Sequence, residues 1–474
     1  MEFVCRMKNK VVLIVLLTAV SLSSGAKSYV PKPGEQAYTV LQSIEGKPLH
    51  EVLGPSFNRH DYSQLHTVDL DAAQPMQEYL GMGACLTDAS AWLISRMNRR
   101  ERKAFYKYVF GDLGISILRL NCGSCDYATE LYNYDDTPDD VQMEHFSVER
   151  DDLYYIPVIK EMQAACPDLF TFSSIWSVPG WMKSSGRMAG GKLLDEYLPA
   201  TANYWAAYLK QYKDRGVRVD AITVQNEPET AQGGGCPATL VSGEQEALLA
   251  GTLMPAAFKQ VGVDAKIWIW DHGYQGYPRV LKELEDPLVR ANIDAVAWHS
   301  HDGTPDMMDS VRTLYPDLPM HHTERGPRLS ELDNWDEFFW SDIIFGAFNH
   351  GCSSFCTFNL LLDQDGQPNA GHFVCDGLRN INTDTGELYD DRQATIFKHV
   401  APYVKRGARV LSIDQPDKNL RVVAFQNPGG EKVVVACCGN GYRGRPRLQI
   451  KNRGEYLNLN LPFGGWSVTT VLIP

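Results

Sequence analysis

Two glutamates stand where a carboxyl group could act on a covalent bond. Glu227 lies in an Asn-Glu-Pro run directly after an apolar segment, and Glu324 ends the segment Met320–Glu324, 97 residues further along. Cleavage of a glycosidic bond needs two carboxyl groups, one that protonates the leaving oxygen and one that attacks the anomeric carbon or activates water. A single glutamate in such a place is more often a solvated loop residue, so catalysis requires that the fold bring this pair together.

The segments that would position the pair alternate between strand-like and helix-like patterns. Short apolar runs are separated by longer amphipathic stretches from about residue 80 to about residue 400. Such alternation predicts a parallel sheet, and eight repeats predict a closed (β/α)8 barrel. The eight strands are expected at Tyr79–Leu86, Ser116–Asn121, Leu169–Ile175, Ala221–Gln225, Lys266–Trp270, Ala295–Trp298, Met320–Thr323 and Ser353–Phe358.

Barrel enzymes carry their chemistry at the carboxyl ends of the strands. Glu227 follows the fourth expected strand and Glu324 the seventh, which lie across the barrel mouth from each other, so both carboxyls can face one bond. Polar and aromatic residues follow the other strands as well, and they predict a polar site of the size of a sugar. These residues are Thr87, Asp88, Asp126, Trp176, Asp271, His272, His299 and Asn359.

The first residues have the pattern of an export signal. Arg6, Lys8 and Lys10 precede a short apolar run and the small residues Ser24–Ala26, which predicts a signal peptide over residues 1–26. We therefore expect a secreted or periplasmic protein. No later stretch is apolar for long enough to predict a transmembrane anchor.

The regions that flank the alternating segments are rich in strand patterns. Short strands between turn residues predict a small antiparallel β-sandwich from residues 405–474, and residues 27–75 are expected to add N-terminal strands to it. The catalytic barrel is then expected over residues 76–404.

Composition and short motifs exclude several partners. A formal net charge of −13 without a cluster of Lys and Arg argues against a nucleic-acid partner. Cys122 and Cys125 form a C-x-x-C, but no second pair completes a zinc site, and pairing among the 11 cysteines is left open. Gly81 and Gly83 form a G-x-G that lacks the third glycine of a dinucleotide-binding turn. We expect neither a metal ion nor a cofactor.

Several motifs are similar to those of glycoside hydrolase family 30, and in particular to its glucosylceramidases. The similar stretches are Gly81–Asp88, Ser124–Tyr127, Tyr134–Asp140, Trp176–Lys183 and Asn226–Pro228. The resemblance implies a barrel with an attached β-sandwich and a carbohydrate or glycoconjugate substrate, with β-glucosides favoured. It implies that Glu227 is the acid/base and Glu324 the nucleophile of a retaining mechanism.

The same resemblance implies roles for residues around this pair. Retention requires carboxyl groups roughly 5–5.5 Å apart and a protonated acid, which predicts a raised pKa for Glu227. His299 and Arg119 are expected to support the carboxylates. The residues expected to contact sugar hydroxyls are Asp126, Trp176, Asn226 and Asn369.

Two positions depart from the glucosylceramidase pattern. His301 stands where a tyrosine normally touches the nucleophile, and Phe358 stands where a tryptophan normally contacts the sugar. Both are expected to border the bound sugar, so the reaction class is unaffected while the specificity is left open. The alternatives to a β-glucosidase are an endo-acting β-1,6-glucanase, a β-xylosidase and a β-fucosidase.

Two other classes of protein remain as alternatives. A metal-dependent barrel hydrolase would need ligands at neighbouring strand ends, although such barrels usually carry a His-x-His on the first strand, where this chain has none. A non-catalytic sugar-binding protein is disfavoured because both glutamates are present. The candidate metal ligands are His299, His301, Asp302, His321 and His322.

Overall fold

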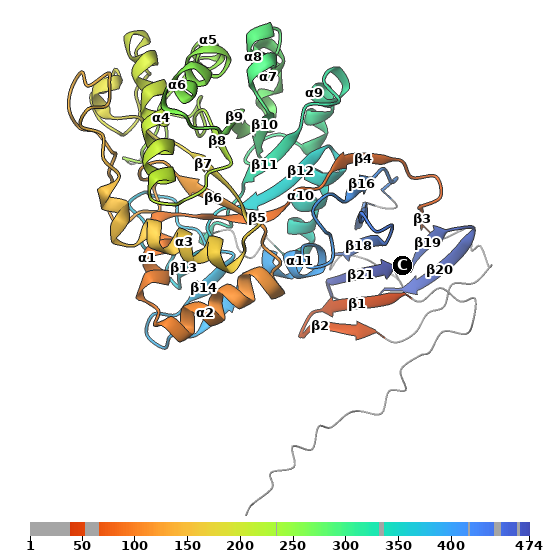
Figure 1. Cartoon of the computed structure of the whole chain (residues 1–474). Coiled ribbons are helices and arrows are strands. Elements are labelled where there is room, and N and C mark those ends of the chain that lie inside the picture. Colours follow the sequence, from red (N-terminus) through yellow and green to blue (C-terminus); the bar gives the residue numbers. More distant parts are fainter. Residues whose placement is uncertain are drawn as a thin grey trace, which may run out of the picture.

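Eight parallel strands close into a barrel (Figure 1). The computed structural model describes residues 38–52, 66–233, 235–330, 336–415, 418–439, 447–461 and 465–474, so the predicted signal peptide lies outside the described residues. The strands pair in chain order, and β12 closes the barrel on β5. They are β5 (Gly81–Leu86), β6 (Ile117–Asn121), β7 (Phe170–Ser174), β8 (Ala221–Thr223), β9 (Lys266–Gly273), β10 (Ala295–His299), β11 (Met320–Glu324) and β12 (Cys352–Thr357). The predicted barrel is confirmed.

Side chains fill the interior of the barrel. Ile117, Phe172 and Trp268 come from three different strands and belong to one buried cluster. Close packing also explains the G-x-G of the sequence, because a Cβ atom at Gly83 would lie 2.1 Å from the carbonyl oxygen of Ile117. The glycine therefore lets β5 approach β6 within the barrel wall.

Helices cover the outside of the barrel and begin at polar capping residues (Figure 1). The hydroxyl of Thr87 accepts a hydrogen bond from the backbone N–H of Ser90 at the start of α1, and Asn98 forms a capping box with Glu101 at the start of α2. No helix among the described residues is both long and apolar enough to cross a membrane. The helices are α1 (Asp88–Arg96), α2 (Arg99–Lys107), α3 (Tyr155–Ala165), α4 (Leu198–Asp214), α5 (Gly243–Leu248), α6 (Met254–Val261), α7 (Tyr277–Glu283), α8 (Pro287–Asn292), α9 (Asp309–Leu314), α10 (Glu337–Asn349) and α11 (Gln393–Val400).

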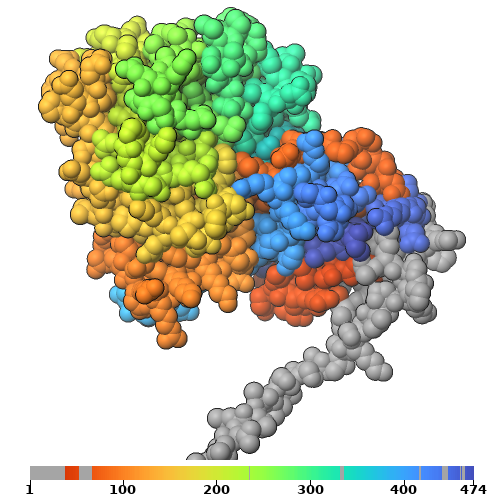
Figure 2. Space-filling view, viewed as in Figure 1, coloured from red at the N-terminus to blue at the C-terminus, as the bar shows by residue number. Residues whose placement is uncertain are grey.

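Strands from both ends of the chain pack together beside the barrel, as the colours of Figure 2 show. One sheet has the order β2 (Lys47–Val52), β1 (Thr39–Ile44), β21 (Ser467–Ile473), β18 (Lys432–Cys438), β17 (Leu420–Gln426), β16 (Arg409–Leu411) and β4 (Pro75–Glu78). The other has the order β20 (Glu455–Asn460), β19 (Arg447–Asn452) and β3 (His66–Asp69). Val40, Val434 and Ile450 belong to the apolar core that the two sheets share. The predicted sandwich is confirmed. A third, smaller sheet contains β13 (Leu361–Asp363), β14 (Arg379–Ile381) and β15 (Leu388–Asp390).

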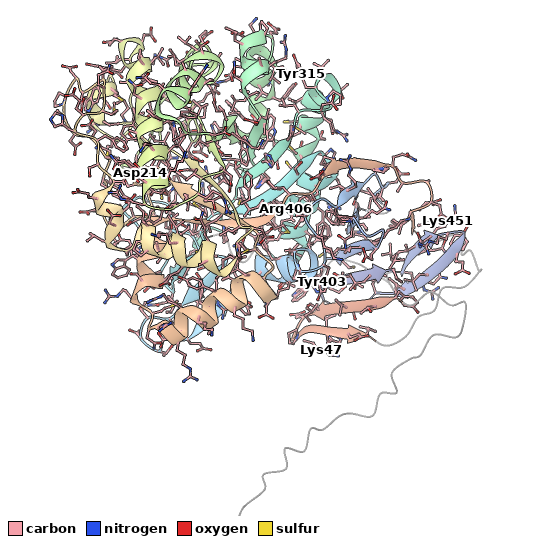
Figure 3. All side chains as sticks on the ribbon, in the orientation of Figure 1. Lys47, Asp214, Tyr315, Tyr403, Arg406 and Lys451 are labelled. Atoms are coloured by element: carbon pink, nitrogen blue, oxygen red, sulfur yellow. The ribbon has the colours of Figure 1, made fainter. Side chains whose placement is uncertain are left out.

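Arg406 fastens the sandwich to the barrel, and Figure 3 labels it between the two parts. Its guanidinium donates hydrogen bonds to the backbone carbonyls of Leu80 at 3.1 Å, Ser116 at 3.0 Å and Asp168 at 2.6 Å. These carbonyls precede or begin barrel strands, so one side chain ties the N-terminal ends of neighbouring strands to the C-terminal segment.

The cysteines of the described structure are free thiols, ten in number. Cys122 and Cys125 are both buried, and burial raises the pKa of each thiol. Their thiols are therefore protonated at neutral pH, which is the form that neither attacks nor ligates readily.

Candidate active site

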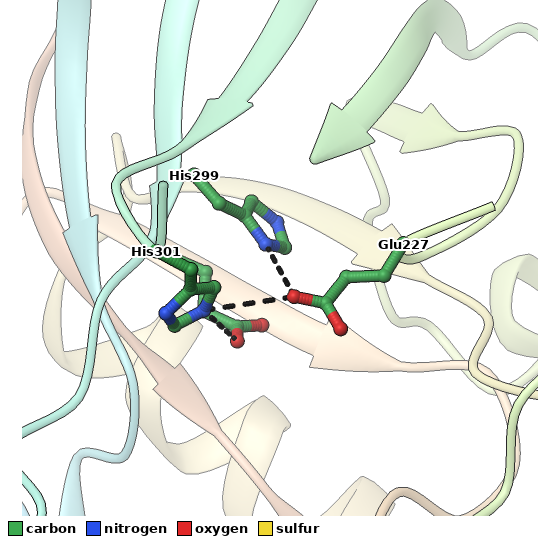
Figure 4. Close-up of side chains that lie close together, drawn as sticks. Glu227, His299 and His301 are labelled. Atoms are coloured by element: carbon green, nitrogen blue, oxygen red, sulfur yellow. Dashed lines mark hydrogen bonds and ion pairs between the residues drawn. The ribbon is translucent and has the colours of Figure 1, made fainter. Parts of the chain in front are cut away.

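Glu227 and Glu324 meet at the mouth of the barrel, and Figure 4 labels Glu227 beside His299 and His301. Glu227 lies in the loop after β8, Glu324 is the last residue of β11, and their exposed fractions are 9% and 7%. The Nε2 atom of His301 lies 3.0 Å from Oε1 of Glu324 and 3.6 Å from Oε1 of Glu227. One carboxylate oxygen of each glutamate lies within 4.8 Å of the other. The structure thus brings the predicted pair together at one imidazole.

The backbone holds Glu227 in an uncommon conformation. Its φ of 46° lies in the left-handed region that residues other than glycine seldom adopt. Its N–H donates to the carbonyl of Asp271 at 3.1 Å, and its own carbonyl accepts from the N–H of Thr230 at 3.0 Å. These bonds offset the strain, which is a feature that clusters at functional sites.

Arg119 places a positive charge beside Glu324. It is fully buried in β6, and its guanidinium donates to Glu324, to Oδ1 of Asn226 at 2.8 Å and to Oδ2 of Asp271 at 2.9 Å. Burial alone would lower the pKa of Arg119, but the negative charges of Asp271 and Glu324 raise it. The charge therefore persists at any working pH, and the contact with Glu324 fits the supporting role expected of Arg119.

Asp271 connects the groups beneath the two glutamates. It is fully buried near the end of β9. Besides Arg119, its carboxylate accepts hydrogen bonds from the hydroxyls of Thr223 and Thr323, each at 2.6 Å, and its Oδ1 lies 3.1 Å from Nε2 of His299. Burial would raise the pKa of Asp271, but the charge of Arg119 and these hydrogen bonds lower it. Asp271 is thus a buried anion that orients both Arg119 and His299.

His299 carries a proton that changes the expected state of Glu227. Burial would lower the pKa of His299, but the charge of Glu324 and hydrogen bonds to Asp271 and Glu227 raise it to about 9. Burial would likewise raise the pKa of Glu227, but the hydrogen bond from His299 and the charge of His299 lower it. The prediction of a raised pKa for Glu227 is therefore wrong for the ligand-free protein. The raised pKa belongs instead to His299, whose Nδ1 lies 3.3 Å from Oε1 of Glu227 (Figure 4).

His301 acts as a hydrogen-bond donor to the carboxylates. Nη1 of Arg325 lies 3.2 Å from Nδ1 of His301, and a guanidinium can only donate, so Nδ1 accepts and Nε2 carries the hydrogen. That hydrogen points at Glu324. Burial would raise the pKa of Glu324, but the charges of His299 and Arg119 and the hydrogen bond from His301 lower it. Glu324 is therefore ionised, as a nucleophile must be.

A cavity of about 400 Å³ at the two glutamates is lined by four of the residues predicted to contact or border the sugar, Asp126, Trp176, His301 and Phe358. The Trp176 ring lies against the guanidinium of Arg119, with 4.7 Å between Cζ and the ring centroid, and stacks on Phe358 at 5.9 Å. Burial and the charge of Glu324 raise the pKa of Asp126 to about 7. The cavity thus combines aromatic faces with a carboxyl group that can bind hydroxyls.

The two predicted asparagines lie away from this lining. Asn226 is buried, and its bond to Arg119 orients its amide behind the glutamates. Asn369 uses both ends of its amide in its own loop, because Nδ2 donates to the carbonyl of Phe373 and Oδ1 accepts from the N–H of Gly371 at 2.7 Å. The sugar contact expected of Asn369 stays a prediction, and it would require these bonds of the amide to rearrange.

The proposed metal ligands are also not brought together as a set. His321 stacks on Trp268 at 4.1 Å inside the barrel, and His322 stacks on Phe355 at 4.1 Å. Among the described residues, the side chains that could jointly hold a metal ion are those of the acidic pair itself with its two imidazoles, Glu227, His299, His301 and Glu324. Because Arg325 directs the Nε2 hydrogen of His301 into this group, that nitrogen has no lone pair for a metal.

The sequence indicates no role in the site for several residues that the structure places there. Asp271 and His272 follow an apolar strand, which marked them as polar residues at a strand end without indicating a role. Gln232 lies in a loop without a motif, and its Nε2 donates to Oε2 of Glu227 at 2.9 Å. Arg325 directly follows Glu324, but the bond that fixes His301 is visible only in the structure.

Known proteins resemble this chain over most of its length. The lysosomal acid glucosylceramidase of Mus musculus is 26% identical over 391 residues, which cover 77% of this chain and 76% of that protein. The endo-1,6-beta-D-glucanase of Neurospora crassa is 25% identical over 406 residues, which cover 78% of this chain and 82% of that protein. The crystal structure of SrfJ from Salmonella typhimurium is 26% identical with a TM-score of 0.84, covering 92% of this chain and 99% of that one. The endo-beta1,6-glucanase BT3312 shares the fold with a TM-score of 0.81 at 23% identity, over 92% of this chain and 99% of that one.

The sequence of the barrel also matches a protein-family model. The model that describes the glycosyl hydrolase family 30 TIM-barrel domain matches residues 79–402, which is more than half of the chain. This range contains both glutamates and each residue described around them. The chain belongs to glycoside hydrolase family 30 and is an O-glycosyl hydrolase with a carbohydrate substrate.

Proposed function

We propose that this protein is a retaining β-glycosidase that hydrolyses β-glucosidic bonds by double displacement. The proposal rests on one observation, the close approach of the carboxylate oxygens of Glu227 and Glu324, which lie within 4.8 Å of each other. An inverting enzyme needs room for water and separates its carboxyl groups by roughly 6.5–9.5 Å, whereas a retaining enzyme needs roughly 5–5.5 Å. The spacing supports direct attack by one carboxylate.

In the first step, Glu324 attacks the anomeric carbon. A bond forms between a carboxylate oxygen and that carbon, the bond to the leaving oxygen breaks, and Glu227 gives a proton to the leaving oxygen. Because the pKa of Glu227 is low and that of His299 is about 9, we place the working proton on the His299–Glu227 pair. Their 3.3 Å contact provides the path by which Glu227 is protonated when substrate excludes water.

In the second step, Glu227 takes a proton from water, and the water oxygen displaces Glu324 from the sugar. Negative charge has meanwhile moved from Glu324, now esterified, to Glu227. Nε2 of His301 lies 3.0 Å from Oε1 of Glu324 and 3.6 Å from Oε1 of Glu227, so its hydrogen can follow this charge with little movement. His301 thereby replaces the single donor that a tyrosine would supply.

Glucose is the sugar that the site and the relatives favour. Asp126 and Trp176 offer the carboxyl and aromatic contacts that a hexose needs. The mouse relative is named a glucosylceramidase and the Neurospora relative an endo-1,6-beta-D-glucanase. The second of these makes an endo-acting β-1,6-glucanase the alternative proposal. We also propose that the protein is exported, because residues 1–26 have the pattern of a signal peptide.

The test is chromophore release from nitrophenyl β-D-glycosides, measured for the wild type and for Glu324→Gln. We expect release from the glucoside and a loss of roughly 10⁴-fold or more in the variant, since the nucleophile is removed. Glu229→Gln is the matched control, because Glu229 is two residues from Glu227 and its side chain is 55% exposed. The first product seen by NMR should be the β-anomer. An α-anomer, or full activity in Glu324→Gln, would refute the mechanism.

A further inference from the structure

Two buried polar atoms in the cavity have no hydrogen-bond partner in the described structure. They are Nδ1 of His272 and Oε1 of Gln232, and both residues line the cavity. An unpaired buried polar atom costs about 1–3 kcal/mol, so proteins rarely keep one without a reason. In a ligand cavity, the reason that fits is a ligand that supplies the missing partner.

Both residues approach Glu227. Nε2 of Gln232 donates to its Oε2 at 2.9 Å, and Nδ1 of His272 lies 3.8 Å from its Oε1, beyond hydrogen-bond distance. Glu227 delivers its proton to the leaving oxygen, so groups gathered around it face the departing part of the substrate. Thr230 holds the His272 ring through a contact of 2.9 Å at Nε2, and burial lowers the pKa of His272. A neutral, fixed imidazole therefore presents Nδ1 to the leaving group.

An aromatic ring lines the same cavity. Phe373 belongs to its lining, and the guanidinium of Arg328 lies over the Phe373 ring with 4.7 Å between Cζ and the ring centroid. The loop of Phe373 touches the loop of Gln232, because Sγ of Cys236 lies 3.3 Å from Nδ1 of His372. A ring together with polar atoms in one cavity matches a sugar, which has C–H faces and hydroxyl edges.

We propose that this part of the cavity is a subsite for a carbohydrate leaving group, with His272 and Gln232 as its hydrogen-bonding residues. The inference deepens the proposed function and rests on it, because it takes Glu227 as the acid. It makes the substrate a β-linked disaccharide or oligosaccharide. An alkyl or sphingoid chain in the same place would leave both polar atoms unpaired.

The experiment measures binding without turnover, by calorimetry on the Glu324→Gln protein. The ligands are methyl β-D-glucoside, the β-1,6-linked disaccharide of glucose and octyl β-D-glucoside. We expect the disaccharide to bind more tightly than the methyl glucoside, and the octyl glucoside to gain nothing comparable. Tighter binding of the octyl glucoside than of the disaccharide would overturn the subsite.

A second variant in the same background assigns the effect to a residue. His272→Phe keeps a ring but removes Nδ1, so one hydrogen bond of about 0.5–1.5 kcal/mol is lost and the disaccharide should bind about two- to tenfold more weakly. Methyl glucoside should bind as before, which also shows that the variant is folded. An unchanged affinity for the disaccharide would overturn the role of His272.

The two proposals can fail separately. If the glucosides do not bind but a β-linked xylose disaccharide binds more tightly than methyl β-D-xyloside, the sugar named above is wrong and the subsite is supported. If no methyl glycoside or disaccharide binds, the proposed function is overturned together with the subsite.

Discussion

His301→Phe removes a donor that lies beside both Glu227 and Glu324, and His301→Tyr returns a donor to the same place. A hydrogen bond to a charged group contributes about 1.5–3 kcal/mol, and each 1.36 kcal/mol corresponds to a tenfold change in rate. The His301 side chain is 30% exposed, so water can replace part of the lost donor. We therefore expect a loss of about ten- to fiftyfold in kcat for the phenylalanine variant.

The comparison of the two variants separates hydrogen bonding from packing. A tyrosine hydroxyl can donate to Glu324 as Nε2 of His301 does at 3.0 Å, so His301→Tyr should lie within about fivefold of the wild type. The assay is steady-state release from an aryl β-D-glycoside, with thermal unfolding as a check on folding. Because the donor acts on charged carboxylates that change during the reaction, kcat should fall more than KM rises. Full activity of His301→Phe, or equal losses in both variants, would refute this account.

Three further predictions concern the charges beneath the site. The pKa of His299 rises from about 6.5 in the unfolded chain to about 9 in the folded protein, which contributes about 3 kcal/mol to the free energy of unfolding. This contribution is fully present below pH 6.5 and is lost as the pH rises through 9. Urea unfolding at a series of pH values measures it, and a free energy of unfolding that does not change with pH would contradict it. Asp271→Asn removes the carboxylate that lies 2.9 Å from the buried guanidinium of Arg119, and should lower the free energy of unfolding by about 3–5 kcal/mol. A loss below about 1 kcal/mol would show that Asp271 is not needed to stabilise the charge of Arg119. Activity should survive prolonged dialysis against EDTA. The hydrogen bond from Arg325 to Nδ1 of His301 puts the hydrogen on Nε2, which then has no lone pair for a metal ion. Inactivation by EDTA that added metal restores would show that the enzyme uses a metal ion.

The sequence by itself determined the barrel and the acidic pair. Most barrel strands contain a short apolar run, because strands that are buried on both faces require apolar residues, so their positions can be read without knowing their partners. Glu227 follows one barrel strand and Glu324 ends another, and the geometry of a barrel then places both at one mouth. The motif likeness to family 30 came from the same local stretches, which the family model covers over residues 79–402.

Only the tertiary structure decided how the site is charged and which of its neighbours take part. The pKa of Glu227 follows from its distance to His299, which ends β10, and sequence spacing does not fix such a distance. Gln232 and Asn369 lie in loops, where hydrogen bonds to nearby groups decide whether an amide reaches the cavity. Electrostatic energies depend on separations of a few ångströms and on burial, so these properties exist only once the strands have closed around Asp271 and Arg119.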